Sequence, residues 1–362
     1  MQSPSSPVPP LNRVFVVGAY VPHGGTHMAY HLGRILQQDF GLPVTAVTVG
    51  DETPSSGLFR YDPEFPSVSV QTMEETIGPD DLLICNPSFS NRHFGLRLPC
   101  RKLMYIQGFN TFKVLDGFFD HYVTVSDFVR DFILGGYGLD CPVIPPFIDV
   151  PPPATAWSER PEYSVAIHLK GENGDQPLLL ARLRDLVRRR APEVAAAIDW
   201  EGGALSSEGA RPHADFLAAI GQARYLLTLS VSEGFGLVPL EAMAQGVVVL
   251  GLDGFGGRHY MRPGQNCATA SYPDLDTAAD RLIAAMRSPH IGQTLSDAGR
   301  RTAEKYGYER FRQAWIAEFS RALALIPLHS AAQFPSTADA RIAGNRPAAG
   351  LATEPVIASN SA

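Results

Sequence analysis

The sequence predicts an α/β protein with two doubly wound domains, each a parallel sheet between layers of helices. The chain has 362 residues, 45% of them hydrophobic, which is enough to bury two cores of ordinary size. Short apolar runs alternate with amphipathic stretches of helical period, as in parallel sheets with crossover helices. The run Pro151-Pro152-Pro153 interrupts this alternation and indicates a linker between the two domains.

The first domain is expected over residues 11–150. Its short apolar runs predict strands, and its amphipathic stretches predict helices. Ser126 precedes the second helix and is expected to cap it by accepting a hydrogen bond from an amide of the first turn. The expected strands are Val14–Gly18, Val44–Val49, Asp81–Cys85, Leu103–Gln107, Tyr122–Val125 and Val143–Pro145, and the expected helices are Thr26–Gln37 and Ser126–Leu134.

A linker over 151–162 and a second domain over 163–307 follow. A final helix over 308–326 has one apolar face that must pack somewhere, and the sequence leaves open on which domain. The leader 1–10 and the tail 327–362 are rich in Pro, Ser and Ala and are expected to be disordered. The expected strands are Ser164–Leu169, Ala197–Trp200, Tyr225–Ser230 and Val247–Leu250, and the expected helices are Pro177–Arg189, Ala214–Gln222, Val238–Ala244 and Thr277–Arg287.

Composition excludes some classes of function. The formal net charge of −7 comes from 37 acidic and 30 basic residues and does not favour nucleic acid as a partner. Four scattered cysteines without a Cys-x-x-Cys pair indicate free thiols in a reducing compartment. The first apolar run, Val14–Val21, is too short for a signal peptide or a membrane span. We expect a cytoplasmic protein, with peripheral contact at the inner face of the membrane and the oligomeric state left open.

The strongest functional signal is the turn that follows the strand ending near Ser230. Gly234 and Gly236 allow the backbone to approach a ligand closely, and a helix then begins with Pro239 in its first turn. Such a turn directs free amides and the positive end of a helix dipole at one point. A phosphate group is the natural ligand there.

Two glutamates flank this phosphate site, Glu233 on the turn and Glu241 on the helix. A carboxylate binds phosphate poorly but accepts hydrogen bonds from two vicinal hydroxyls. A diphosphate with hydroxyls on both sides describes a nucleoside diphosphate sugar. The alternative, two ordinary solvated acids beside a helix start, leaves the glycines unexplained.

The string Glu233-x7-Glu241, with Gly234-Phe235-Gly236-Leu237 after the first glutamate and Ala-Met-Ala after the second, resembles a donor-site signature. It is similar to that of retaining glycosyltransferases of the GT-B fold, especially glycosyltransferase family 4 (glycosyl transferases group 1). The segments 254–260 and 145–149 extend the resemblance, which covers most of residues 14–326. It implies two domains facing each other across a cleft.

The resemblance further implies a retaining transferase that moves a sugar from a UDP- or GDP-activated donor. The acceptor would be a glycan, a lipid-linked sugar or a small molecule, as in the synthesis of bacterial surface polysaccharides and glycoconjugates. The nucleotide sugar would be a co-substrate, with no tightly bound cofactor. No Asp-x-Asp motif follows a predicted strand, so no tightly held metal is expected.

Residue roles follow from the same resemblance. Glu233 would contact hydroxyls of the transferred sugar, and Glu241 would bind the ribose. Lys170 would neutralise the leaving diphosphate, on which negative charge builds. Relatives place an arginine near this lysine; here Arg258 is the candidate for the second charge. Gly234, Phe235, Gly236 and Leu237 would complete the donor-binding set.

A second glycine-rich element runs from the first strand into Gly24-Gly25. It lacks the Gly-x-Gly-x-x-Gly spacing, which makes an oxidoreductase the least favoured enzyme class. The resemblance places His23, Gly24, Gly25 and Thr26 on a loop that faces the cleft and the acceptor. The alternative is a tight turn with Thr26 as a helix cap.

Gln107 follows a strand where many relatives carry a histidine near the reacting sugar. Glutamine cannot act as a general base, and this loss is tolerable if the leaving phosphate itself takes the acceptor proton. The loops 87–98 and 108–119 are expected to contact the acceptor. Their aromatic side chains could stack on a sugar ring or a lipid chain, or belong to the core: Phe89, Phe94, Phe109, Phe112, Phe118 and Phe119.

Two other functions stay open. A non-catalytic relative would bind the nucleotide sugar without transferring the sugar, as the missing second base and Gln107 suggest. Another enzyme on the same scaffold, such as a sugar-nucleotide epimerase, would form product without an acceptor. The donor base, the sugar, the acceptor and the linkage are not predicted.

Overall fold

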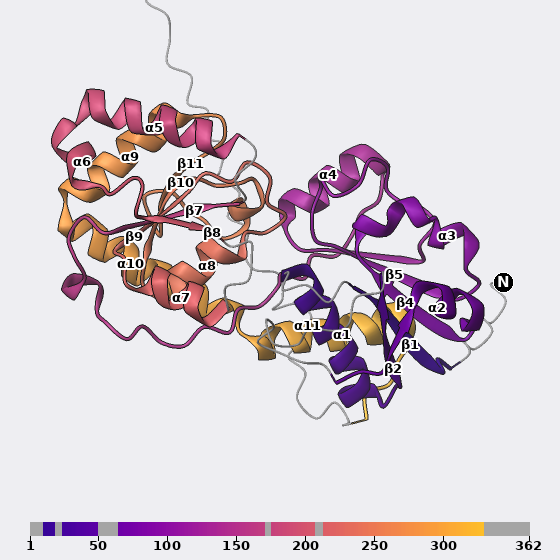
Figure 1. Ribbon diagram of the computed structural model, residues 1–362. Helices are drawn as coiled ribbons and strands as arrows, with labels where there is room; N and C mark the ends of the chain where they lie inside the picture. Colours follow the sequence, from indigo (N-terminus) through magenta and orange to yellow (C-terminus); the bar gives the residue numbers. More distant parts are fainter. Residues whose placement is uncertain (1–9, 19–23, 50–63, 171–174, 207–212, 329–362) are drawn as a thin grey trace, which may run out of the picture. The chain divides into compact units, whose positions relative to one another are not determined.

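The computed structural model describes residues 10–18, 24–49, 64–170, 175–206 and 213–328, with the side chains of 204–206 left out (Figure 1). These residues form two sheets, with strand orders β3-β2-β1-β4-β5-β6 and β11-β10-β9-β7-β8. All neighbouring strands are parallel. We call the two parts the N-terminal and the C-terminal domain. The predicted α/β class with two doubly wound parallel-sheet domains is confirmed.

The N-terminal domain has its topological switch between β1 and β4, where the strand order reverses. In this register Val14 lies opposite both Val44 and Leu82. Ligands of open α/β sheets bind beyond the carboxyl ends of the strands at such a point. The strands are β1 (Arg13–Val17), β2 (Val44–Thr48), β3 (Ser67–Ser69), β4 (Asp81–Cys85), β5 (Arg101–Ile106) and β6 (His121–Thr124), and the helices are α1 (Gly24–Phe40), α2 (Val70–Thr76), α3 (Phe94–Arg97) and α4 (Asp127–Tyr137).

The C-terminal domain buries both faces of its sheet. Along β9, Tyr225 and Leu227 belong to one hydrophobic core and Leu226 to the other. This explains the continuous apolar runs in the sequence. Figure 1 shows α5 and α9 on one face and α7, α8 and α10 on the other. The strands are β7 (Val165–Leu169), β8 (Ala204–Ser206), β9 (Tyr225–Thr228), β10 (Val248–Leu252) and β11 (Ala268–Ala270), and the helices are α5 (Gln176–Arg190), α6 (Pro192–Ala197), α7 (His213–Gly221), α8 (Leu237–Ala244), α9 (Leu275–Arg287) and α10 (Pro289–Ala303).

Two strand predictions are wrong. The segment Ala197–Trp200 is not a strand, because the alanine-rich stretch before it forms α6 with Pro192 at its start, and the strand at this position in the sheet is β8. Alanine is the best helix former, which explains the outcome. Val143–Pro145 makes only an isolated bridge to Thr124. The flanking prolines lack the N–H groups that a longer ladder needs.

The predicted cap at Ser126 is confirmed. Ser126 has extended backbone angles, and its Oγ accepts a hydrogen bond from Val129 N at 3.2 Å. The helix α4 ends at Gly138, which has the left-handed φ of 69° that glycine adopts without strain. Both ends of α4 are therefore specified by local sequence.

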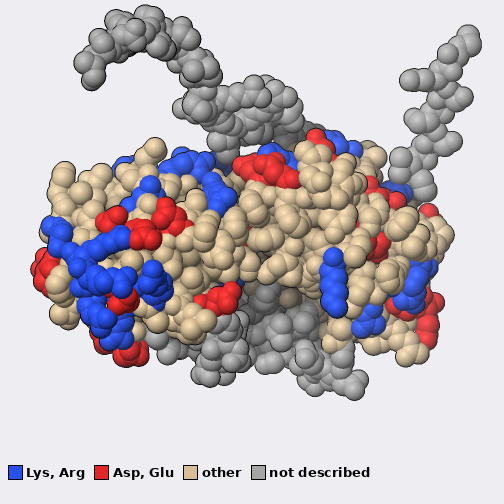
Figure 2. Space-filling view, turned by 90° about the horizontal axis from the view of Figure 1, so that it is seen from above, with Lys and Arg blue, Asp and Glu red and all other residues tan. Residues whose placement is uncertain are grey.

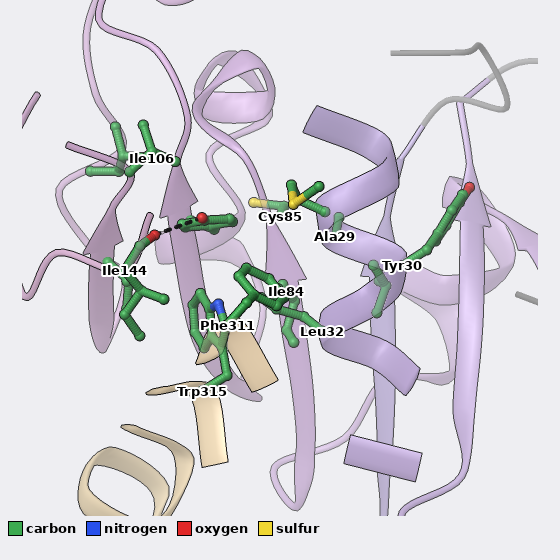
Figure 3. Close-up of a cluster of buried hydrophobic side chains, with 14 of the residues drawn as sticks. Ala29, Tyr30, Leu32, Ile84, Cys85, Ile106, Ile144, Phe311 and Trp315 are labelled. Atoms are coloured by element: carbon green, nitrogen blue, oxygen red, sulfur yellow. Dashed lines mark hydrogen bonds between the residues drawn. The ribbon is translucent and has the colours of Figure 1, made fainter. Parts of the chain in front are cut away.

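The final helix, α11 (Tyr308–Leu323), packs on the N-terminal domain. Trp315 is fully buried, with its ring 5.0 Å from that of Tyr105 on β5, and Phe319 lies 6.0 Å from Phe40 at the end of α1. Arg312 forms an ion pair with the buried Asp39 of α1. Figure 3 shows Phe311 and Trp315 of α11 among buried side chains that include Leu32 of α1 and Ile84 of β4. The Tyr105 hydroxyl donates a 2.8 Å hydrogen bond to the carbonyl of Ile144.

The linker 151–162 has no strand and contains only the short 3-10 helix Trp157–Glu159. Its end is tied to the C-terminal domain by the buried Arg160, which donates to the carbonyls of Ala223 and Gln245 at 2.9 and 2.6 Å. The expected disordered segments 1–10 and 327–362 lie almost entirely outside the described residues.

Charged side chains are intermixed on the face shown in Figure 2, including the part where Lys and Arg side chains gather. The arginines of α5 are largely paired with acids; for example, Arg184 Nη1 lies 2.8 Å from Glu201 Oε1. Among the described helices, none combines the length and the apolar character needed to cross a bilayer.

Candidate functional site

The predicted donor residues gather at the carboxyl ends of three adjacent strands of the C-terminal sheet. Lys170 follows β7, Glu233 lies five residues after the end of β9, and Asp253 follows β10. Because β7 and β10 both pair with β9, these residues share one edge of the sheet. Lys170 and Glu233 are in direct contact, with Nζ and Oε1 2.6 Å apart.

Glu233 is held so that one of its carboxylate oxygens stays open. Its Oε1 accepts a hydrogen bond from Ser230 Oγ at 2.6 Å, in addition to the contact with Lys170. Its backbone is fixed by hydrogen bonds of 2.8 Å to the Gly254 carbonyl and 3.0 Å from the Gly256 amide. Within the described residues, Oε2 makes no hydrogen bond. A ligand hydroxyl can therefore pair with this oxygen.

Glu241 shows the same arrangement inside the domain. It is buried on α8, and its Oε1 lies 2.9 Å from Nε2 of His213 at the start of α7. Its second oxygen, Oε2, likewise makes no hydrogen bond in the part of the chain that the structure describes. Sequence reasoning missed His213, because the 27 residues between it and Glu241 carry no spacing that signals the contact.

The turn between the two glutamates presents the amino end of α8. Gly236 precedes the helix with a left-handed φ of 87°, and no side chain caps the helix there. The buried Tyr260 donates its hydroxyl to the Gly236 carbonyl at 2.5 Å, which fixes the turn. The first-turn amides of α8 and its dipole are thus available to an anion. Phe235 was expected to contribute to donor binding, but its ring is buried against Tyr260.

The segment after β10 supports Glu233 and positions Arg258. Phe255 has φ 65° and ψ −61°, and the amide of Gly256 donates to the carbonyl of Gly254 at 2.9 Å, which defines a strained γ-turn. Arg258 donates from Nε to the buried Asp253 at 2.8 Å, and its guanidinium lies 4.6 Å from the Phe255 ring centre.

The predicted residues of the N-terminal domain also lie at strand ends. Gln107 follows β5 and donates from Nε2 to the Gly25 carbonyl at 3.0 Å. Gly24, Gly25 and Thr26 form the first turn of α1 instead of a loop, and Thr26 is buried within the helix, so it is not a cap. His23 lies outside the described residues.

The two domains touch at Gly234. A Cβ at this position would overlap the backbone carbonyl of Gln107. The carbonyl of Gly234 accepts a 2.6 Å hydrogen bond from Ser126 Oγ, and Asn110 Nδ2 donates to Ser232 Oγ at 2.9 Å. A Cβ on Gly24 would lie 2.7 Å from Leu237 Cδ1. These contacts bring the start of α1 and the loops after β5 and β6 against the donor turn.

Two further groups near the site have structural roles. His168 on β7 is buried, and this burial lowers its pKa from 6.5 to about 4, so it is neutral near pH 7. Phe94 and Phe119 are buried in the core, whereas Phe118 is 59% exposed. Among the acceptor-loop aromatics, Phe109 reaches the donor domain: its ring centre lies 6.0 Å from that of Phe255.

Residues 208–305 match the family model of glycosyl transferases group 1. The matched segment contains Glu233, the turn at Gly234, Glu241 and Arg258 and ends just after α10, in the short 3-10 helix Glu304–Tyr306. Lys170 and the whole N-terminal domain lie outside it. A comparison with curated protein sequences finds no significant match.

The fold is similar to several solved structures. Sucrose-phosphate synthase from Thermosynechococcus elongatus is 13% identical, with a TM-score of 0.63 over 86% of this chain and 99% of that one. HepE from Anabaena, in complex with UDP and glucose, is 12% identical, with a TM-score of 0.62 over 86% of this chain and 100% of that one. An S. aureus TarM mutant, in complex with fondaparinux, alpha-GlcNAc-glycerol and UDP, is 15% identical, with a TM-score of 0.54 over 69% of this chain.

This chain spans 58% of the length of the TarM structure, which is less than two thirds. At these identities the likenesses concern the fold, and they agree with the two parallel sheets described above. The chain thus has the GT-B fold, and its C-terminal domain carries a segment that matches the glycosyl transferases group 1.

Proposed function

We propose that the protein is a retaining glycosyltransferase that moves a sugar from a nucleoside diphosphate donor to an acceptor hydroxyl. The observation that carries this proposal is the pairing of Glu233 and Glu241 on either side of the uncapped amino end of α8. Each glutamate keeps one open oxygen for hydroxyls, and the helix end between them suits a diphosphate.

In this proposal the donor lies along the turn. Glu241, oriented by His213, would accept hydrogen bonds from the ribose, and Glu233 would accept them from the sugar. The amides of Gly236 and Leu237 would bind the diphosphate, with Gly234 allowing its close approach. UDP is the first nucleotide to test, because the solved structures of HepE and TarM contain it.

Lys170 would supply the charge that bond breaking requires. The bond between the anomeric carbon and the β-phosphate oxygen breaks, and a bond to the acceptor oxygen forms on the same face. The acceptor proton passes to the departing diphosphate, so Gln107 need not act as a base. Lys170, released from part of its contact with Glu233, would stabilise the negative charge on the leaving group. Arg258 would add a second, more distant charge.

The N-terminal domain would contribute the acceptor side through Gly24, Gly25, Thr26 and Gln107, together with the unassigned His23. We propose an acceptor that belongs to surface polysaccharide or glycoconjugate synthesis. The enzyme would act in the cytoplasm or at the inner face of the membrane. The reaction as proposed uses no resident cofactor or metal ion.

The test is a product assay with purified protein, UDP- and GDP-sugars and a panel of glycan, lipid-linked and small-molecule acceptors. Release of nucleoside diphosphate that depends on an acceptor and is lost in Glu233→Gln supports the proposal. Nucleotide binding without release would favour a non-catalytic relative, and conversion of the donor without an acceptor would favour an epimerase. A product whose anomeric configuration is inverted would contradict the retaining mode.

A further inference from the structure

A buried serine of the N-terminal domain reaches the backbone of the donor turn. Ser126 has no exposed surface, and its Oγ lies 2.6 Å from the carbonyl oxygen of Gly234. Gly234 directly follows Glu233, the residue proposed to contact the transferred sugar. This contact joins residues 108 positions apart in the chain and is partly buried.

The direction of this hydrogen bond is unambiguous. A carbonyl oxygen can only accept, so the Ser126 hydroxyl donates to Gly234. The same Oγ accepts from Val129 N at 3.2 Å as the cap of α4. The Ser126 hydroxyl therefore accepts from α4 and donates to Gly234 at the same time. Ser126 is thus oriented by its own domain.

The backbone around Gly234 has little room to move otherwise. The carbonyl of Gln107 lies where a Cβ of Gly234 would be, and a Cβ on Gly256 would overlap Gly234 from its own domain. Glu233 is bonded to Gly254 and Gly256 on that second side. The turn is therefore supported by both domains. The N-terminal domain contributes the hydrogen bond from Ser126 to the Gly234 carbonyl.

We propose that Ser126 is a positioning residue for sugar transfer, one that acts through Gly234 and does not touch the substrate. Its hydroxyl holds the Glu233–Gly236 turn in the geometry that the transferred sugar and the diphosphate require. This inference rests on the glycosyltransferase function proposed above. The capping role of Ser126 alone would predict an effect on stability only.

Four single variants separate positioning from capping. Ser126→Ala removes both roles, and Ser126→Thr retains a hydroxyl for both. Ser69→Ala is the matched control for a lost cap, because Ser69 Oγ accepts from Thr72 N at 3.1 Å at the start of α2, away from the site. Asn110→Ala removes an exposed bond between the domains, from Asn110 to Ser232.

The first readout is amide hydrogen exchange of the peptide spanning 232–237 without substrate, which does not depend on activity. A buried hydrogen bond of ordinary strength predicts about tenfold faster exchange in Ser126→Ala. We expect no change in Ser69→Ala, less than about a twofold change in Asn110→Ala, and recovery in Ser126→Thr. Unchanged exchange in Ser126→Ala would overturn the proposal even if the protein transfers no sugar.

The second readout is steady-state kinetics of transfer. In Ser126→Ala we expect kcat to fall about tenfold while the Kd for the nucleotide stays within about threefold, because Glu241 and α8 are untouched. Ser126→Thr should restore most of kcat. A loss of kcat equal to that of Ser69→Ala would reduce Ser126 to a cap and overturn its positioning role. Absence of transfer by the wild type would instead contradict the proposed function, and the exchange result would still stand.

Discussion

Glu233 and Glu241 are built alike, although one lies on a turn and the other on a helix. Each gives Oε1 to a neighbouring basic side chain, Lys170 or His213, and leaves Oε2 to a ligand. A buried or half-buried carboxylate that is fixed in this way loses little conformational freedom when a hydroxyl binds. The pairing therefore favours recognition of a ligand with hydroxyls at both ends.

Replacing Lys170 should affect chemistry more than binding. In Lys170→Ala we expect kcat for sugar transfer to fall about 100-fold, because the charge that develops on the leaving diphosphate loses its partner. Lys170→Arg should retain a large part of the rate. Comparison of kcat with the Kd of the nucleotide measures this, and a variant with wild-type kcat would refute the role of Lys170.

At the residue scale, the sequence predicted those candidate residues that lie close together in the chain or next to a predicted strand. Glu233, Gly236 and Glu241 belong to one continuous motif, and Lys170 directly follows a strand. The contacts from His213 and Ser126 could not be predicted, because each joins segments that only the folded chain brings together. The burial of the Phe235 ring was not predicted from the sequence.

At the scale of elements, predictions held where turn signals bound an apolar run, and they were wrong where helix propensity or prolines prevail. The strand Asp81–Cys85 was predicted with its observed bounds, because this short run with an apolar centre lies between the turn-forming segments 78–80 and 86–87. The alanine-rich segment before Trp200 forms α6, because helix propensity prevails over a brief apolar run. The short strands β3 and β11, three residues each, carry too few residues to show a period.

Burial of two histidines makes stability dependent on pH. Burial lowers the pKa of His168 on β7 to about 4 and that of His31 on α1 to about 3, from an ordinary 6.5. Between these values and 6.5 the unfolded chain binds more protons than the folded one, so stability rises with pH. The contribution is fully present above pH 6.5 and is lost as the pH falls toward 4.

We expect His168→Gln to reduce this dependence. Its unfolding free energy should fall less steeply than that of the wild type between pH 6.5 and 4, by up to about 1.4 kcal/mol per pH unit. Urea unfolding at a series of pH values measures the slope, with the exposed His290→Gln as control. Identical slopes for wild type and His168→Gln would contradict the assignment of a buried neutral His168.

The return of α11 to the N-terminal domain makes Trp315 a stability determinant. Truncation of this fully buried side chain in Trp315→Ala should lower the unfolding free energy by about 3–5 kcal/mol. Ile326→Ala, at a residue 85% exposed, should change it by less than about 0.5 kcal/mol. Denaturant unfolding followed by circular dichroism compares the two, and equal small effects would show that α11 does not pack as described.

At the scale of the whole molecule, the donor turn is one of the places where the two domains meet. Gly234 lies against the Gln107 carbonyl, so Gly234→Ala must separate these segments. We expect this variant to lose at least about 100-fold in kcat, because a misplacement of about 1 Å at a site can cost that much. Gly135→Ala is the control, since a Cβ there meets no atom within 4 Å. Wild-type activity in Gly234→Ala would contradict the tight contact.

The most direct test of the donor site is isothermal titration calorimetry with UDP, GDP and ADP on the wild type, Glu241→Ala and His213→Ala. We expect one nucleotide to bind the wild type. Glu241→Ala should weaken this binding at least about tenfold, and His213→Ala should weaken it less. The exposed Glu304→Ala should bind like the wild type. A folded wild type that binds none of the three nucleotides, or a Glu241→Ala variant that binds as tightly as the wild type, would contradict the donor site.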